Sequence, residues 1–144
     1  MFLGQFEHNI DDKGRMTIPS RFRDEVGEAA ILTRAFDQNL TVMPEPVFEG
    51  LAASLNELSV TDPEVRLLQR LIFSNAVRVE FDRAGRMLIP QFLRDQADLK
   101  NEAVVVGQGN RFEVWAPELW AEQVSLQNSP ATAQRFKELN LPLR

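Results

Sequence analysis

The chain has 144 residues, with 16 Lys and Arg against 21 Asp and Glu, and its net charge of −5 argues against a uniformly basic nucleic-acid binder. It contains no Cys and a single His, His8, which excludes disulfides and thiolate metal sites and disfavours His-based zinc sites and catalytic triads. The length fits one ordinary domain or two small ones, and we expect no secretory signal, no membrane span and a cytoplasmic location.

The first motif joins two short strands through a tight turn. Residues 6–10 alternate apolar and polar side chains, which predicts a strand with one buried face. Asp11 and Gly14 suit the two ends of a turn, because Asp accepts backbone hydrogen bonds and Gly adopts a positive φ. A second strand resumes at Arg15 and stops at Pro19. The pattern predicts a β-hairpin, followed by a short helix over 20–26.

The following residues complete a first unit. We expect strands over 30–33 and 40–43 on either side of a turn at 37–39. An apolar stripe from Phe48 to Leu58 predicts an amphipathic helix. Thr61 and Glu64 have the spacing of a capping box, which predicts a second helix that ends near residue 74.

A second unit repeats the first with an offset of 71 residues. Residues 82–94 match residues 11–23, so that Asp82, Gly85, Arg86 and Arg94 stand where the first copy has Asp11, Gly14, Arg15 and Arg23. Strands are expected over 103–106 and 112–115. The Gly-rich segment 107–110 lies between two strands, which predicts a hairpin turn rather than a phosphate-binding loop. Residues after 127 are polar and are predicted to be a mobile or interface-forming tail.

Arg15 and Arg86 lie opposite the apolar Met and Ile side chains of their strands and should therefore point outward beside each turn. One interpretation is a local ion pair between each Arg and the Asp four residues before it. The other is a ligand contact, and the presence of two copies, with Arg23 and Arg94 also at matching offsets, brings this interpretation closer to the first. The two interpretations are compatible if Asp orients the side chain that Arg presents.

The charge is unevenly distributed along the chain. Residues 10–23 carry four cations and two anions, and residues 81–94 carry three cations and one anion, so each segment has a net charge of +2. Because the whole chain has a net charge of −5, the residues outside these two segments have a net charge of −9. A chain with this distribution can direct one face towards phosphate and keep the other away.

The order strand, Asp-x-x-Gly-Arg, strand, Ile-Pro and short Arg-bearing helix resembles the SpoVT-AbrB DNA-binding domain. Two such domains in tandem after an opening Met-Phe-x-Gly resemble the MraZ family of bacterial transcriptional regulators, over about residues 1–120. Further matching features are Thr61-Asp62-Pro63, Val105-Val106-Gly107 and the pair Trp115 and Trp120.

The resemblance implies an α+β fold with a mainly β core, namely a tandem AbrB-like swapped-hairpin β-barrel that forms a pseudo-dimer within one chain. It divides the chain into a first domain (5–47), a helical linker (48–75), a second domain (76–119) and a C-terminal helix and tail (120–144).

The resemblance also implies a DNA-binding transcriptional regulator that acts on the promoter of the division and cell-wall gene cluster, as a ring-shaped, nucleoid-associated homo-oligomer. Its DNA contact maps to Arg15 and Arg86, with Asp11, Gly14, Asp82 and Gly85 completing the structural motif. Around them, the cations expected to position the DNA backbone are Lys13, Arg21, Arg23, Arg83 and Arg94.

An AbrB-fold protein-interaction or antitoxin-like module stays open as an alternative, because a fold does not fix a function. We expect no enzyme, because one His and no Cys leave little catalytic chemistry. We likewise expect no metal, no cofactor, no membrane contact and no small-molecule substrate.

Overall fold

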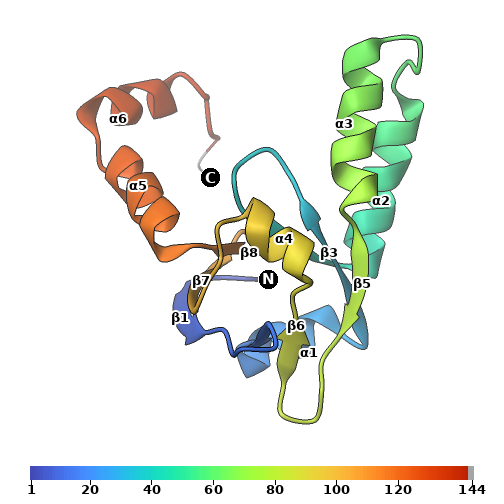
Figure 1. The fold of residues 1–144 in the computed structure, drawn as a ribbon. Coiled ribbons are helices and arrows are strands. Elements are labelled where there is room, and N and C mark those ends of the chain that lie inside the picture. Colours follow the sequence, from blue (N-terminus) through green and yellow to red (C-terminus); the bar gives the residue numbers. More distant parts are fainter. Residues whose placement is uncertain (143–144) are drawn as a thin grey trace.

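The computed structural model describes residues 1–142, in which strands and helices occur in the predicted order (Figure 1). The strands are β1 (Gln5–Asn9), β2 (Arg15–Thr17), β3 (Ala29–Arg34), β4 (Leu40–Pro44), β5 (Val77–Glu80), β6 (Arg86–Leu88), β7 (Glu102–Gly107) and β8 (Phe112–Trp115). The helices are α1 (Ser20–Val26), α2 (Glu45–Glu57), α3 (Pro63–Ser74), α4 (Gln91–Gln96), α5 (Pro117–Gln127) and α6 (Pro130–Lys137).

The two halves of the chain exchange strands. A six-stranded antiparallel sheet has the order β1-β7-β8-β4-β3-β5, and β2 pairs with β6 in a separate two-stranded ribbon. Strand β1 of the first half therefore lies on β7 of the second, and β5 of the second half lies on β3 of the first. Because each half completes the sheet of the other, the chain is an intrachain pseudo-dimer, as the resemblance implied.

The predicted hairpins are formed only at their turns. Backbone bridges join Ile10 to Met16 and Phe81 to Met87, but beyond them the two arms of each motif separate. Strands β1 and β5 join the large sheet, while β2 and β6 pair with each other. The expectation of two ordinary hairpins was therefore wrong, because each strand satisfies its backbone groups on the opposite half of the molecule. The ribbon closes the sheet into a barrel.

The barrel interior is filled from both halves. Met16 and Ile18 of the first motif and Met87 and Ile89 of the second have no exposed surface. Burying one such side chain contributes roughly 1.5–3 kcal/mol. The ring of Phe22 on α1 lies 5.2 Å from those of Phe2 and Phe112 and 5.4 Å from that of Phe6. One unit alone would leave its half of this core in water, which explains the exchange.

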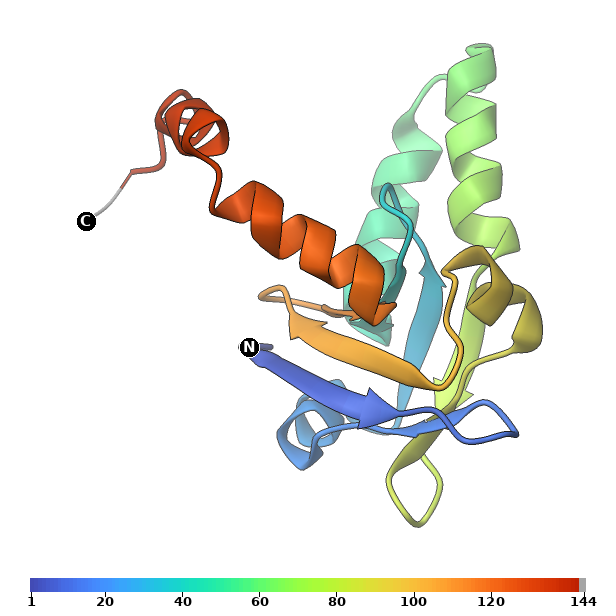
Figure 2. The same ribbon diagram turned by 60° about the vertical axis from the view of Figure 1, so that its left-hand side comes forward.

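Two helical pairs extend away from the barrel, α2 with α3 and α5 with α6 (Figures 1 and 2). The hydroxyl of Thr33 on β3 donates to the carbonyl of Ile72 at 2.6 Å and so fixes α3 to the sheet. The predicted capping residue of α3 was wrong by one position. Asp62, not Thr61, caps the helix, since its carboxylate accepts from the backbone N–H of Glu64 at 2.9 Å.

Among residues 1–142, none of the helices has the length and apolar character needed to cross a membrane.

Candidate nucleic-acid interface

The β2–β6 ribbon presents one face to the core and one to the solvent. In its register Arg15 lies opposite Leu88, Met16 opposite Met87, and Thr17 opposite Arg86. Met16 and Met87 are completely buried, so the neighbouring positions on both strands point outward. Arg15 and Arg86 are therefore diagonal neighbours on the same outer face, a relationship that places side chains about 7–8 Å apart.

Asp11 forms the first turn. One carboxylate oxygen, Oδ1, accepts from the backbone N–H groups of Lys13 at 3.0 Å and Arg15 at 2.9 Å. The other, Oδ2, accepts from the side-chain Nε of Arg15 at 2.8 Å. The carboxylate thus closes the turn and orients the guanidinium group that follows it.

Asp82 forms the second turn in the same way. Its Oδ1 accepts from the backbone N–H groups of Ala84 at 3.0 Å and Arg86 at 2.9 Å, and its Oδ2 accepts from Nε of Arg86 at 2.8 Å. The two motifs also meet, because Nη1 of Arg86 lies 3.9 Å from Oδ2 of Asp11. The two copies of the sequence motif therefore form the same hydrogen bonds, and pseudo-twofold symmetry relates the two turns.

These contacts lower the pKa of both aspartates. The largest cause is the hydrogen bond from the backbone N–H of the Arg four residues on, and the guanidinium groups of Arg15 and Arg86 act in the same direction. Partial desolvation raises the pKa of each carboxyl but is outweighed. Asp11 and Asp82 are therefore charged at neutral pH, and each turn keeps its orienting anion.

Each Arg of the ribbon keeps donors for an external partner. The side chains of Arg15 and Arg86 are 31% and 33% exposed. Within residues 1–142, hydrogen bonds to side-chain atoms of these two residues involve only Nε. The two Nη groups of a guanidinium form a planar fork that matches phosphate oxygens or the acceptor edge of guanine. Asp11 and Asp82 thus orient the two Arg side chains, and the ligand role of Arg15 and Arg86 stays a prediction.

Arg23 and Arg94 have an intramolecular role that the sequence did not indicate. Nε of Arg23 donates to the carbonyl of Ile18 at 3.0 Å, and Nε of Arg94 donates to that of Ile89 at 2.9 Å. The guanidinium of each then lies across the turn of the opposite half. A Cβ placed on Gly85 would be 2.6 Å from Cζ of Arg23. The expected contribution of Arg23 and Arg94 to DNA positioning stays a prediction.

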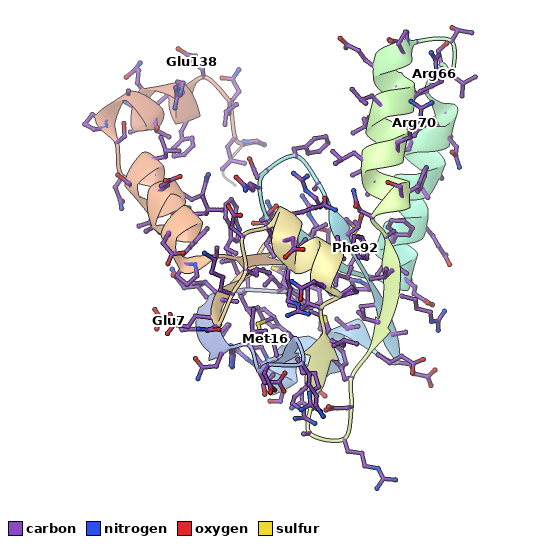
Figure 3. All side chains as sticks on the ribbon, in the orientation of Figure 1. Glu7, Met16, Arg66, Arg70, Phe92 and Glu138 are labelled. Atoms are coloured by element: carbon purple, nitrogen blue, oxygen red, sulfur yellow. The ribbon has the colours of Figure 1, made fainter. Side chains whose placement is uncertain are left out.

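The remaining predicted cations are exposed but are not repeated between the halves. Lys13 and Arg83 lie in the two turns, and in the 71-residue offset they match Ala84 and Asp12. Arg21 on α1 corresponds to Phe92 on α4, which is 43% exposed (Figure 3). Each turn thus carries one additional positive charge, at a different place in each half.

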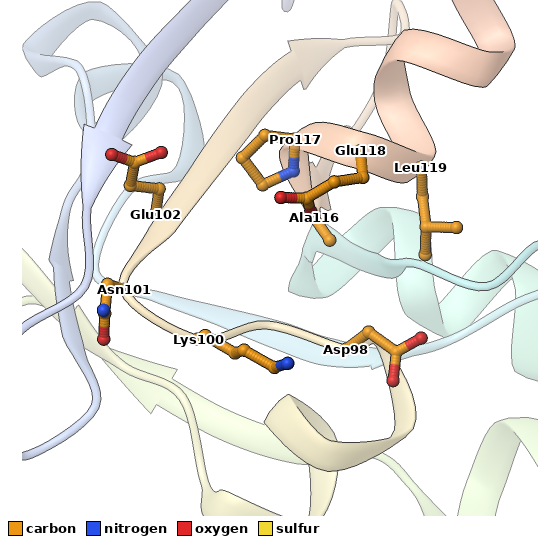
Figure 4. A pocket seen from close by; sticks show the side chains of 8 residues that line it. All are labelled: Asp98, Lys100, Asn101, Glu102, Ala116, Pro117, Glu118 and Leu119. Atoms are coloured by element: carbon orange, nitrogen blue, oxygen red, sulfur yellow. The ribbon is translucent and has the colours of Figure 1, made fainter.

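A cavity of about 590 Å³ lies between the α4–β7 connection and the start of α5 (Figure 4). Its charged side chains are those of Asp98, Lys100, Glu102 and Glu118. Three carboxylates against one ammonium repel a polyanion, so this cavity is no candidate for a nucleic-acid contact.

Thr17 and Leu88 also belong to the outer face of the ribbon and were not assigned a role from the sequence. They match each other at the 71-residue offset, and Leu88 is 52% exposed. In the sequence, Met87 and Ile89 alternate with Arg86 and Leu88, which already indicated that Leu88 lies on the same face of the strand as Arg86. The cross-pairing of β2 with β6, which brings Leu88 beside Arg15, could not be derived from that local pattern.

The family model described as "MraZ protein, putative antitoxin-like" matches the chain twice, over residues 1–71 and 72–139. Curated relatives of similar length include the "Transcriptional regulator MraZ" of Roseiflexus sp. (strain RS-1), which is 45% identical over 96% of this chain and 99% of its own. The protein of the same name from Thermomicrobium roseum is 46% identical, with the same coverage of both chains. That of Finegoldia magna is 45% identical over 90% of each chain.

Proposed function

The chain belongs to the MraZ family, and from this premise we propose that it is a transcriptional regulator that binds double-stranded DNA through the outer face of the β2–β6 ribbon. The observation that carries the proposal is the pair of guanidinium groups of Arg15 and Arg86. They lie on one face, and each is oriented by an Asp through Nε. Within residues 1–142 no hydrogen bond involves an Nη group of either Arg, although Nη1 of Arg86 also lies 3.9 Å from Oδ2 of Asp11.

A two-stranded ribbon has the right size for a groove of the double helix. The major groove of B-DNA is about 12 Å wide and admits a β-ribbon whose outer side chains reach the base edges. In this arrangement Arg15 and Arg86 contact guanine or the phosphates beside it, and one bidentate Arg–guanine pair contributes roughly 1–3 kcal/mol of discrimination. The cations that would position the backbone are Lys13, Arg21, Arg23, Arg83 and Arg94.

The acidic remainder of the chain supports a single orientation on DNA. The two motif segments each carry +2 while the other residues carry −9, so phosphate is attracted to the ribbon side and repelled elsewhere. The charge of the whole chain therefore does not oppose a local contact.

We further propose that the protein acts as a ring-shaped homo-oligomer, in the cytoplasm and at the nucleoid, on the promoter of the division and cell-wall gene cluster. One ribbon offers few base contacts, so several subunits that bind repeated elements together would gain affinity through effective concentration. Support for the assembly comes from exposed apolar side chains on the two helical extensions, which are Leu58, Val60, Leu67, Leu126, Phe136, Leu139 and Leu141.

The direct test is a footprint of the purified protein on the DNA upstream of its own gene. We expect a protected segment with the wild-type chain and its loss with Arg15→Ala or Arg86→Ala. Arg70→Ala is the matched control, since Arg70 is exposed on α3, far from the ribbon (Figure 3). Protection that is the same in all four proteins would overturn the proposal.

The alternative, an antitoxin-like protein-interaction module, is favoured by the description of the matching family model. Salt dependence separates the two. Binding to DNA through several phosphates predicts that log K falls against log salt with a slope of about −0.9 per phosphate neutralised. A protein partner held by apolar contacts predicts a slope near zero.

A further inference from the structure

The two halves of the ribbon are alike in their Arg residues and unlike in their other outer side chain. At the 71-residue offset Arg15 matches Arg86, whereas Thr17 matches Leu88. Cross-strand pairing places Leu88 opposite Arg15 and Thr17 opposite Arg86. Each guanidinium group therefore has a different neighbour, apolar for Arg15 and hydroxyl-bearing for Arg86.

Leu88 is not needed as an apolar residue by the core that residues 1–142 form. Its neighbours in the chain, Met87 and Ile89, are completely buried, while Leu88 itself is 52% exposed on the solvent face. At the equivalent position the fold accepts Thr17, so the backbone does not require Leu. Leu88, the last residue of β6, thus presents an apolar side chain on a solvent face that it shares with Arg15, Thr17 and Arg86, and it lies outside the hydrophobic core.

We propose that Leu88 is a specificity-determining residue of the DNA interface and contacts the C5-methyl group of a thymine next to the base or phosphate held by Arg15. This inference rests on the proposed function. In the major groove thymine presents a methyl group that apolar side chains recognise, and no other standard base carries one there. Leu88 and Arg15 are directly opposite on paired strands, where side chains are about 4.5–5.5 Å apart, so the two would read adjacent features of the groove.

Thr17 takes the equivalent place in the other half with a shorter side chain and a hydroxyl group. Its hydroxyl can donate to or accept from a base edge or a phosphate, while its methyl reaches less far than the isobutyl group of Leu88. Arg15 and Arg86 would therefore make similar contacts in the two halves, and Leu88 would add a methyl contact in one half.

Replacement of thymine by uracil tests this contact, because it removes the methyl group and leaves every hydrogen-bonding group in place. Each thymine of the protected segment is replaced in turn, and the Kd of the full-length protein is measured at fixed salt. We expect the replacement to weaken wild-type binding about fourfold at the thymine beside Leu88, the effect of burying one methyl group. Leu88→Ser should remove that dependence, and Leu88→Met should keep it.

Leu3→Ser is the matched control, because Leu3 is 59% exposed but lies just before β1, outside the ribbon. This control should keep the fourfold ratio between the Kd for uracil-substituted DNA and the Kd for thymine-containing DNA. The inference would be overturned if the protein protects a DNA segment but no thymine replacement changes the wild-type Kd by twofold or more. This result needs only the wild-type protein, and it would leave the proposed function standing. A ratio that persists in Leu88→Ser would also overturn it. The absence of any protected segment would overturn the proposed function itself.

The molar mass of the assembly is measured on the same samples. If Leu88→Ser dissociates the oligomer while the thymine dependence is unchanged, Leu88 serves a contact between copies of the chain, and the inference is wrong.

Discussion

Arg94 of the second half lies directly across Gly14 of the first. A Cβ on Gly14 would be 2.7 Å from Cζ of the Arg94 guanidinium, and Gly14 has a φ of +86°. The carbonyl of Gly14 also accepts from the backbone N–H of Ile89 at 2.9 Å. The turn that carries Arg15 is therefore held by side-chain and backbone contacts from the opposite half.

Gly14→Ala should destabilise the chain for two separable reasons. The left-handed conformation costs roughly 1–2 kcal/mol for a residue with a Cβ, and the added methyl group must also displace the Arg94 guanidinium. Gly109→Ala is the control, since Gly109 has a similar φ of +83° but a Cβ added there would meet nothing within 4 Å. We expect a larger fall in the free energy of unfolding for Gly14→Ala than for Gly109→Ala, measured by denaturant titration.

The contact itself is isolated by a double-mutant cycle of Gly14→Ala with Arg94→Ala. Because the two residues are in contact, the decreases in the free energy of unfolding caused by the two substitutions should be non-additive. Additive losses, or an equal effect of the two Gly variants, would show that Arg94 does not constrain the turn.

Arg23→Ala and Arg15→Ala should affect different properties. Arg23 donates to the carbonyl of Ile18 and lies across Gly85, so its loss should lower the Tm. Within residues 1–142 the side chain of Arg15 makes one hydrogen bond, from Nε to the Asp11 carboxylate, so its loss should weaken DNA binding with a smaller change in Tm. Thermal unfolding and a binding titration on the same preparations check the difference. Equal Tm losses would contradict the assignment.

The turns should become less stable in acid. The pKa of Asp11 and of Asp82 is lowered from the ordinary value of 3.8 by the hydrogen bonds from the Arg four residues on. A carboxyl with a lowered pKa stabilises the folded state above its unfolded pKa, and this contribution is lost as the pH falls from 3.8 through the folded value. A carbon-detected NMR titration should place the pKa of both carboxyl groups below 3.8.

Asp11→Asn combined with Asp82→Asn should therefore have a lower Tm than the wild type at neutral pH and a shallower fall in Tm below pH 3.8. Asp12→Asn is the control, because Asp12 is exposed and its side chain takes no part in the turn's hydrogen bonds. Parallel acid curves for the wild type and the double variant would refute this origin of the acid sensitivity.

Local patterns in the sequence predicted elements and faces well. The alternation around Met16 and Met87 identified the buried positions, and the short helix expected over 20–26 after Pro19 is α1. Local patterns could not predict which strands pair, since β1 next to β2 has the same alternation whether the arms pair or separate. The exchange is decided by closure of the barrel, and only the family resemblance indicated it.

In the candidate site, too, local patterns predicted contacts close in sequence but not contacts between the two halves. The spacing of Asp11 and Arg15 predicted their ion pair, which is 2.8 Å long. The position of Arg94 across Gly14 depends on residues 80 positions apart in the chain, and no local pattern encodes it. The neighbours of Arg15 on the ribbon face likewise depend on the register of β2 with β6.

DNA recognition by the ribbon is tested by the affinity of the Arg15→Ala, Arg86→Ala double variant for the protected DNA segment, measured at several salt concentrations alongside Arg70→Ala. We expect the double variant to lose at least about thirtyfold in affinity, because two contacts worth roughly 1–3 kcal/mol each are removed, and we expect Arg70→Ala to bind as the wild type does. A double variant that keeps the wild-type affinity and the wild-type salt slope would contradict the account, because the outer face of the ribbon would then not be the surface that meets DNA.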